Sequence, residues 1–359
     1  MKKHNFSAGP SILPQETLEG AADAVREWKD FGGLSLVEVS HRSPQFVAVM
    51  QEAKDLVVEL LKIPDSHEVI FCQGGASMQF CMVPYNLMYV NGIAGYVNSG
   101  TWSDKAIKEA RIFGEVKEVA SSKEDGYSYY PNLNSIEVNL DYLHITTNNT
   151  ISGTQMREDL KYDGILVADM SSDIFSRPVD VSKYGLIYAG AQKNLGPAGV
   201  CLVIVRKNLL GKNSRNIPSM LNYASYIEKE SMFNTPPVFA IYASLLTLRW
   251  LKREGGVEVF AKRNREKAEL LYNFLDSCRL FETWVDTASR SYMNVVFKLC
   301  DENLASRFQQ KLDAYGISGL SGHRSVGGYR ASLYNAMPLK SVEYLVEVLR
   351  SFEKEVLHG

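Results

Sequence analysis

The stretch LIYAGAQKNLGPAG, residues 186–199, starts as a short apolar run and ends in small residues that break regular structure. The apolar run predicts a buried strand, and Gly196 and Pro197 predict that regular structure stops soon after it. Lys193 lies between them, where no helical face keeps it in water and its small neighbours cannot fill a core. Burial disfavours the charged ammonium, so we expect Lys193 to lose proton affinity and to form a Schiff base with an aldehyde.

A second apolar run, GILVAD at residues 164–169, ends in Asp169. The segment between the two runs is long enough for a crossover, so the strands are expected to be parallel and to end at one edge of a sheet. Lys193 and Asp169 would then share the ligand-binding rim of an open α/β sheet. A lysine for the aldehyde and a carboxylate for the protonated ring nitrogen are what pyridoxal 5′-phosphate (PLP) requires. The alternative for Asp169 alone is a helix or turn cap.

The composition is that of an ordinary globular chain: 359 residues, of which 45% are apolar and 22% are charged. This length suits two domains. The net charge of −2 gives no reason to expect nucleic acid or a membrane as a partner. The five cysteines form no CxxC pair, and the N-terminus has no apolar stretch long enough for export. We therefore expect no metal site, reduced thiols and a cytoplasmic location.

The order of the expected elements predicts a large α/β domain followed by a smaller α+β domain. Apolar runs predict a mainly parallel, seven-stranded sheet from residues 68–72, 94–98, 116–120, 142–146, 164–169, 186–190 and 199–205. Helical spacing and caps predict long helices at residues 15–29, 44–62, 257–277 and 340–356. Two glycines at 255 and 256 mark the boundary. We expect a large PLP-binding domain over residues 15–255 and a small domain from residues 1–14 and 256–359.

Two segments look suited to a phosphate. QGGAS at residues 73–77 lies between a strand and a helix, where free backbone N–H groups and the helix dipole point at one spot. It lacks the P-loop lysine and the GxGxxG spacing, which argues against a nucleotide. SMFNT at residues 231–235 precedes a second expected helix, with Thr235 as its N-cap. Thr101 is likewise expected to cap a helix that begins at Trp102, which places Trp102 at the predicted rim; a core position is the alternative for this tryptophan.

Cationic residues gather in two loops. His323, Arg324 and Arg330 lie among glycines within residues 321–332, and His41-Arg42 directly precedes an expected helix N-cap at Ser43. Arginine suits two-point contacts with carboxylate or phosphate, so these loops predict an anionic ligand. A solvated turn is the alternative.

With these residues collected, the chain resembles the phosphoserine aminotransferases, class V aminotransferases of PLP-dependent fold type I. The resemblance covers nearly the whole chain and rests on FSAGPSILP (6–14), EVSHRS (38–43), FCQGGAS (71–77), SGTW (99–102), YAGAQKNLGPAG (188–199), SMFNTPP (231–237) and GHRSVGGYRASLYNAMP (322–338).

The resemblance implies a role for each of these residues. Lys193 binds the cofactor covalently and moves the proton, and Asp169 pairs with the ring nitrogen. The other cofactor contacts implied are Ala76, Ser77, Trp102, Thr150 and Gln192, joined by Asn234 and Thr235 from a neighbouring subunit. Substrate contacts are implied for His41, Arg42, His323, Arg324 and Arg330, with Arg330 on the α-carboxylate. Some relatives carry arginine where this chain has Ser77, so that phosphate contact is built differently here.

The implied reaction moves the amino group of L-glutamate to 3-phosphohydroxypyruvate and gives O-phospho-L-serine and 2-oxoglutarate, a step of serine biosynthesis. Bacterial relatives often also make 4-phosphohydroxy-L-threonine for pyridoxine biosynthesis. The implied assembly is a homodimer with shared sites. The alternatives are an alanine–glyoxylate type aminotransferase, a cysteine desulfurase and a non-catalytic binding protein. A desulfurase needs a reactive cysteine on a mobile rim loop, and a non-catalytic protein has no need of both Lys193 and Asp169.

Overall fold

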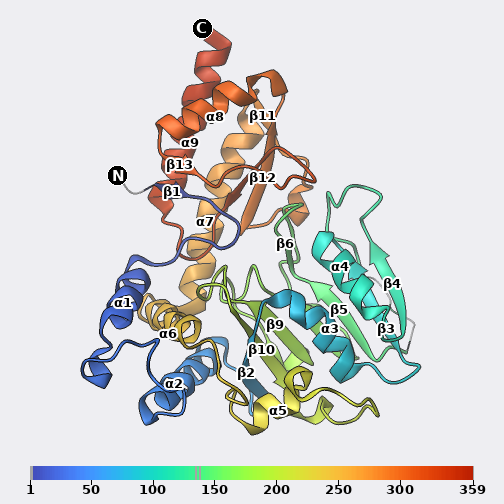
Figure 1. Ribbon diagram of the computed structural model, residues 1–359. Helices are drawn as coiled ribbons and strands as arrows, with labels where there is room; N and C mark the ends of the chain where they lie inside the picture. Colours follow the sequence, from blue (N-terminus) through green and yellow to red (C-terminus); the bar gives the residue numbers. More distant parts are fainter. Residues whose placement is uncertain (1–2, 134–135, 137–138, 359) are drawn as a thin grey trace.

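A computed structural model describes residues 3–133, 136 and 139–358, and its centre is a seven-stranded sheet (Figure 1). In spatial order the strands are β2 (His67–Gln73), β10 (Val200–Arg206), β9 (Leu186–Gly190), β8 (Leu166–Asp169), β5 (Tyr142–Thr146), β3 (Ile93–Asn98) and β4 (Glu115–Ser121). Only β10 runs antiparallel to its neighbours in this sheet, so the expected mainly parallel, seven-stranded sheet is confirmed.

The central strands of the sheet are covered on both faces, which explains why they are continuous apolar runs rather than alternating ones. In β2, Val69 and Phe71 join one buried cluster, whereas Ile70 and Cys72 join another. The first cluster packs under α1 (Gln15–Arg26), α2 (Pro44–Leu61) and α6 (Val238–Arg253). The second packs under α3 (Ala76–Leu87), α4 (Thr101–Ala110) and α5 (Tyr223–Glu228).

A smaller antiparallel sheet follows, with the strands β11 (Phe281–Glu282), β12 (Asn294–Leu299) and β14 (Tyr329–Ser332). A third buried cluster joins it to α7 (Gly256–Ser277), α8 (Ala305–Ala314) and α9 (Leu339–His358). Near the N-terminus, β1 (His4–Asn5) pairs with β13 (Ile317–Ser318) of this unit. In Figure 1 α7 runs from the large sheet up into the smaller unit.

The remaining elements are short. A small hairpin joins β6 (Asn148–Asn149) to β7 (Thr154–Gln155). Single turns of 3₁₀ helix lie at η1 (Lys29–Phe31), η2 (Val181–Lys183), η3 (Lys207–Leu209), η4 (Ser219–Leu221), η5 (Thr287–Ser289) and η6 (Glu302–Leu304). Among the described residues, no helix is both long and apolar enough to cross a membrane.

Two expected helix caps are wrong. α4 begins at Thr101 itself, with Gly100 as its N-cap, because the Ser103 hydroxyl accepts from the Gly100 N–H at 3.0 Å. α6 begins at Val238 after a non-helical Pro237, so Thr235 lies outside the helix. A residue that precedes proline is disfavoured in the helical region, and this applies to Pro236 before Pro237.

Candidate active site

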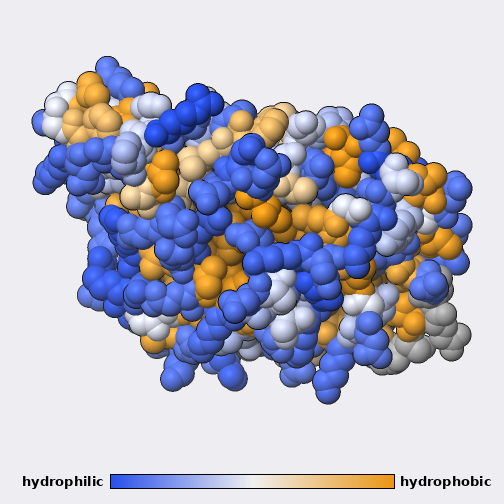
Figure 2. All heavy atoms as spheres, turned by 90° about the horizontal axis from the view of Figure 1, so that it is seen from below, coloured by the Kyte–Doolittle hydropathy of each residue, from blue (hydrophilic) through white to orange (hydrophobic). Residues whose placement is uncertain are grey.

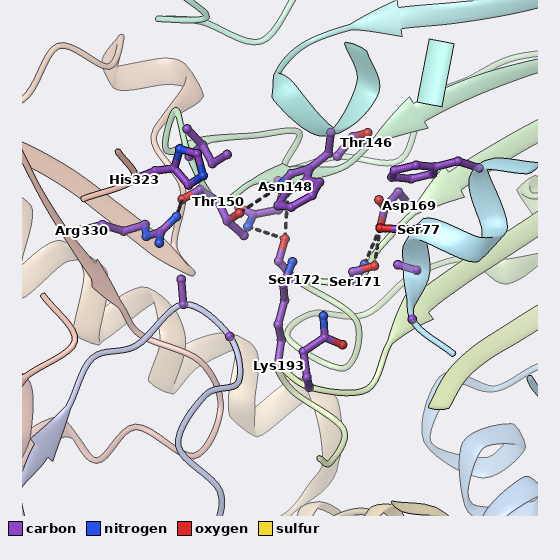
Figure 3. Close-up of a pocket in the computed structure, with 18 residues that line it drawn as sticks. Ser77, Thr146, Asn148, Thr150, Asp169, Ser171, Ser172, Lys193, His323 and Arg330 are labelled. Atoms are coloured by element: carbon purple, nitrogen blue, oxygen red, sulfur yellow. Dashed lines mark hydrogen bonds between the residues drawn. The ribbon is translucent and has the colours of Figure 1, made fainter. Parts of the chain in front are cut away.

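A pocket of about 320 Å³ lies where the carboxyl ends of the central strands meet the smaller unit (Figure 3). Both Lys193 and Asp169 line it, as the parallel arrangement of β8 and β9 predicts. Nine of the residues proposed for the site from the sequence line this pocket: Ala76, Ser77, Trp102, Thr150, Asp169, Gln192, Lys193, His323 and Arg330.

Lys193 sits in a tight turn that directly follows β9. The backbone N–H groups of Lys193, Leu195 and Gly196 all donate to the Ala191 carbonyl, and the Ser11 hydroxyl donates to the Lys193 carbonyl at 2.6 Å. The lysine is partly accessible from the pocket. Burial lowers the pKa of its amine, Asp169 opposes that shift, and Arg330 adds to it. The turn therefore presents an amine with reduced proton affinity to whatever binds here.

Asp169 ends β8 and is only 6% exposed. Its Oδ1 accepts from the Ser171 N–H at 2.9 Å and from the Ser171 hydroxyl at 2.6 Å, which fixes the carboxyl group in the pocket wall (Figure 3). Burial raises the pKa of this carboxyl, while Lys193 and the Ser171 hydrogen bonds pull it back down. A cationic ring nitrogen beside Asp169 would lower it further, because an opposite charge favours the carboxylate.

Trp102, Thr150 and Arg330 form one connected wall. The Trp102 indole N–H donates to the Thr150 hydroxyl oxygen at 2.9 Å, and Arg330 Nη1 donates to the Thr150 carbonyl at 2.8 Å. The Lys193 amine lies 5.8 Å from the centre of the Trp102 ring. The ring thus provides a flat apolar surface beside the amine, with a guanidinium at the end of the same hydrogen-bonded chain.

Two buried polar atoms in the pocket wall lack a partner. Thr146 Oγ1 and Arg330 Nε make no hydrogen bond to any described residue. Buried polar groups are nearly always hydrogen-bonded in native proteins, so these two atoms indicate a polar ligand. For Arg330 the matching chemistry is a carboxylate, which a guanidinium binds through two parallel hydrogen bonds.

The first turn of α3 closes one end of the pocket. Ala76 and Ser77 lie in that turn, and the N-cap residue Gly75 has no side chain with which to satisfy the turn's N–H groups. A side chain at Gly190 would meet Gln192 Oε1 at 2.6 Å, so glycine there lets Gln192 approach this end of the pocket. A helix N-terminus with free N–H groups suits a phosphate.

The pocket residues fit PLP. They supply an amine of lowered pKa, a fixed carboxyl group, a flat indole and a helix N-terminus. Thr146 Oγ1 and Arg330 Nε are buried and have no hydrogen-bond partner among the described residues, so they can bind polar atoms of the cofactor or substrate. These are the groups that bind an aldehyde, a ring nitrogen, a ring face and a phosphate.

Five proposed residues do not line this pocket: His41, Arg42, Asn234, Thr235 and Arg324. His41 is buried elsewhere, and Arg42, Thr235 and Arg324 are exposed. The Thr235 carbonyl accepts from Gln73 Nε2, which holds the segment at the β2 edge of the sheet. In one copy of the chain the pocket therefore contains His323 and Arg330 but not the rest of the proposed cationic set.

The sequence reasoning missed several residues of the pocket. Thr146 is the last residue of β5, Asn148 lies two residues later, and Ser171 and Ser172 come shortly after Asp169. Asn148 Nδ2 donates to the Ser172 hydroxyl at 2.8 Å, which ties the two loops together (Figure 3). The available signal was their position: both loops leave carboxyl ends of parallel strands at the rim that holds Lys193.

The chain is similar to known proteins over nearly its full length. The sequence model of the family described as aminotransferase class V matches residues 3–345. A phosphoserine aminotransferase of Azobacteroides pseudotrichonymphae is 58% identical, with 99% of this chain and 98% of the relative covered. A solved phosphoserine aminotransferase described with its Schiff base has a TM-score of 0.96 at 45% identity, over 99% of this chain and all of the other. The PLP-bound enzyme of Trichomonas vaginalis has a TM-score of 0.92 at 33% identity, over 97% and 100% of the two chains.

Proposed function

The chain belongs to the class V aminotransferases, and we propose from this membership and from its pocket that it works as a phosphoserine aminotransferase. It transfers the amino group of L-glutamate to 3-phosphohydroxypyruvate, giving O-phospho-L-serine and 2-oxoglutarate. The observation that carries the proposal is that Lys193, Asp169 and Arg330 open into one pocket.

Each of these residues has a distinct task in the proposal. PLP, when bound, supplies an electron-accepting ring and carries the amino group from one substrate to the other. Lys193 is the general base and acid: it removes the proton from Cα of the amino donor and, in the second half of the cycle, delivers a proton to Cα of the new amino acid, which its lowered pKa supports. Asp169 keeps the ring nitrogen protonated, and Arg330 binds the α-carboxylate that both amino-acid substrates share.

The phosphate end of the substrate is assigned to the cationic residues His41, Arg42, His323 and Arg324. His323 already lines the pocket, and Arg330, Arg324 and Lys105 all lie near enough to lower the pKa of its imidazole beyond the effect of burial. The cofactor phosphate is assigned to Ala76, Ser77 and Gln192, with Thr150 and Trp102 beside the ring. Asn234 and Thr235 would meet that phosphate from a second subunit.

A homodimer with shared sites accounts for the proposed residues that lie outside the pocket. Large apolar side chains are exposed on both sides of Asn234 and Thr235, where Phe233 is 38% and Phe239 39% exposed, and Met78, which follows the pocket residue Ser77, is 42% exposed. Figure 2 shows apolar residues reaching the lower face of the molecule at several places between hydrophilic ones. Exposed apolar residues next to an incomplete site support docking of a second copy.

Three further proposals follow from the sequence. We divide the chain into a large domain, residues 15–255, and a small domain, residues 1–14 and 256–359, of which residues 1, 2 and 359 lie outside the described part. The pairing of β1 with β13 supports this division. A cytoplasmic location is supported by the five described cysteines, which are all free thiols. The third proposal is that the enzyme also uses 4-phosphohydroxy-L-threonine and so takes part in pyridoxine biosynthesis.

A half-reaction assay tests the function. The PLP-loaded enzyme is mixed with O-phosphoserine, phosphohydroxythreonine, serine or alanine, and the cofactor absorbance is followed. We expect rapid spectral change with the first two and slow change with serine and alanine, since only the phosphorylated substrates engage the cationic residues. Faster reaction with alanine than with O-phosphoserine would instead favour the alanine–glyoxylate type, and no spectral change with O-phosphoserine would refute the proposal.

A further inference from the structure

A second cavity lies away from the active-site pocket and shares none of its lining residues. Its volume is about 200 Å³, and it is bounded by the loop after β8, by α7 and by the residues before β12. Arg157, Arg177 and Arg265 line it, and no aspartate or glutamate does. Three guanidinium groups around one small cavity indicate an anionic ligand.

The three arginines differ in how far their charge is already balanced. Arg265 pairs with Glu269 at 2.6 Å in an exposed contact, and Arg177 pairs with Asp159 at 2.9 Å. Arg157 makes no ion pair among the described residues. It donates to the carbonyls of Thr287 and Arg290 and stacks at 4.4 Å on the Tyr292 ring. Arg157 is therefore held in place with its charge uncompensated.

The guanidinium group of Arg177, which also lines this cavity, has N–H groups that lack acceptors among the described residues. Its Nη1 donates to Asp159 and to the Pro178 carbonyl, but its Nε and Nη2 are buried and make no hydrogen bond to any described residue. Burial lowers the pKa of this guanidinium, but Asp173 and Asp159 outweigh burial and raise it, so the group is charged. A buried charged donor left unsatisfied is costly, and an anion in the cavity would relieve this cost.

Asn264 places an acceptor without a donor in the wall of the same cavity. Its Nδ2 donates to the Ser176 carbonyl at 3.2 Å and to Asn335 Oδ1 at 2.8 Å, which fixes which amide atom is which. Its Oδ1 is then a buried acceptor with no partner among the described residues, and Asn264 is 1% exposed. The ligand that satisfies this cavity must bring a hydrogen-bond donor together with its negative charge.

We propose that this cavity is a binding site for a small oxyanion that carries its own hydroxyl group, such as monohydrogen phosphate or an α-hydroxycarboxylate. The anionic oxygens meet Arg157 and Arg177, and the hydroxyl group donates to Asn264. The site is separate from the proposed catalytic pocket, so it stands whether or not the assigned reaction is correct.

Calorimetric titration of the PLP-loaded enzyme tests this site with matched pairs of anions. Monohydrogen phosphate is compared with sulfate, and glycolate with acetate, because the second member of each pair lacks a hydroxyl group at neutral pH. We expect the hydroxyl-bearing member to bind about tenfold more tightly in at least one pair, and the pair concerned identifies the ligand as phosphate or carboxylate. Equal binding within both pairs overturns the proposal, and this comparison needs no variant.

A pair of variants separates this cavity from anion binding in the catalytic pocket. Arg157→Gln should weaken the selective binding by about tenfold or more. The matched control is Arg215→Gln, because Arg215 also donates to backbone carbonyls and lies 5.8 Å from an aromatic ring, but outside this cavity. Binding that is unchanged in Arg157→Gln, or weakened equally in both variants, overturns the assignment.

Discussion

Among the described residues that line the active-site pocket, the basic side chains of Lys193 and Arg330 accompany one carboxyl group, that of Asp169. Arg330 and burial both lower the pKa of the Lys193 amine, whereas Asp169 raises it. Arg330 has its own pKa lowered by burial and makes one hydrogen bond, to the Thr150 carbonyl, through Nη1. The pocket therefore places an amine of reduced proton affinity beside an arginine whose Nε lacks an acceptor among the described residues, as amine chemistry on a carboxylate-bearing substrate requires.

Replacing Arg330 with lysine tests the carboxylate assignment. Lysine keeps the charge but loses the planar two-point contact, and a hydrogen bond to a charged group contributes about 1.5–3 kcal/mol. We expect kcat/KM to fall about 10- to 100-fold for both glutamate and O-phosphoserine, because both carry an α-carboxylate. Arg324→Ala is the comparison and should affect O-phosphoserine far more than serine. Loss confined to O-phosphoserine in Arg330→Lys would move Arg330 to the phosphate.

The elements show what could be read from the sequence and what could not. Most strands of the large sheet were predictable because both faces of the sheet are buried there, so these strands are apolar runs; the edge strand β4, which carries charged residues and is exposed or half-buried, is the exception. The cap assigned to Thr235 failed because consecutive prolines delay α6, and the one assigned to Thr101 failed because the Ser103 hydroxyl accepts from the Gly100 N–H, so the helix begins one residue earlier. The α5 helix was missed because its six residues are too short to show a period.

Within the site, Lys193 and Asp169 were predictable because each directly follows an apolar strand. Arg42 and Arg324 were predicted from the family motif, and one copy of the chain does not bring them to the pocket. A motif identifies which residues meet a ligand, but not from which subunit or in which loop conformation they do so.

The buried imidazole of His144 on β5 should make the folded protein less stable at acidic pH. It is buried, its Nε2 pairs with the Tyr188 hydroxyl at 2.9 Å, and burial lowers its pKa to about 3. The unfolded chain gains this proton below about pH 6.5. The folded chain gains it only near pH 3, so stability falls as the pH falls through this window. We expect the free energy of unfolding to lose up to about 5 kcal/mol more in the wild type than in His144→Gln across this window. Equal pH slopes would contradict this.

In the loop before β14, Gly322 lies where the backbone leaves no room for a side chain. A Cβ at Gly322 would lie 2.0 Å from the Gly327 carbonyl oxygen, and the Gly322 N–H donates to the Gly328 carbonyl at 2.8 Å. Gly322→Ala should therefore displace the loop that carries His323 and Arg324, costing about 1–3 kcal/mol of stability and raising KM for O-phosphoserine. Gly327→Ala is the control, since its Cβ meets no atom within 4 Å and only its positive φ is strained. Similar KM values in both variants would exclude this loop from substrate binding.

The whole molecule consists of a large sheet and a smaller unit joined by a hydrogen-bonded chain of asparagines next to the active site. Asn194, the neighbour of Lys193, accepts from the Asn335 N–H at 2.9 Å, and Asn335 Oδ1 accepts from Asn264 on α7 at 2.8 Å. The turn that holds Lys193 is thus tied to both units. The proposed second copy would complete the site from outside.

Mixed dimers test the shared site. Lys193→Ala and Thr235→Asp should each be inactive alone, the second because it places a carboxylate at the cofactor phosphate. In a dimer that contains one of each, one site keeps both wild-type residues if Thr235 acts across the interface. Equal amounts, denatured and refolded together, should recover about a quarter of wild-type activity, because half the dimers are mixed and each has one complete site. No recovery would place Thr235 in its own chain's site, and an active Thr235→Asp variant would place it outside any site.

The central claim is that Lys193, opposite Asp169, is the residue that holds the cofactor. Borohydride reduction of the PLP-loaded enzyme, followed by peptide mass mapping, tests it most directly. Two other lysines could compete: Lys105, which lies 4.6 Å from the centre of the Trp102 ring, and Lys267, whose pKa is lowered by burial to about 7. We predict that the cofactor mass appears on the Lys193 peptide and is lost in Lys193→Ala. Cofactor mass on Lys105, on Lys267 or on no lysine would contradict the account.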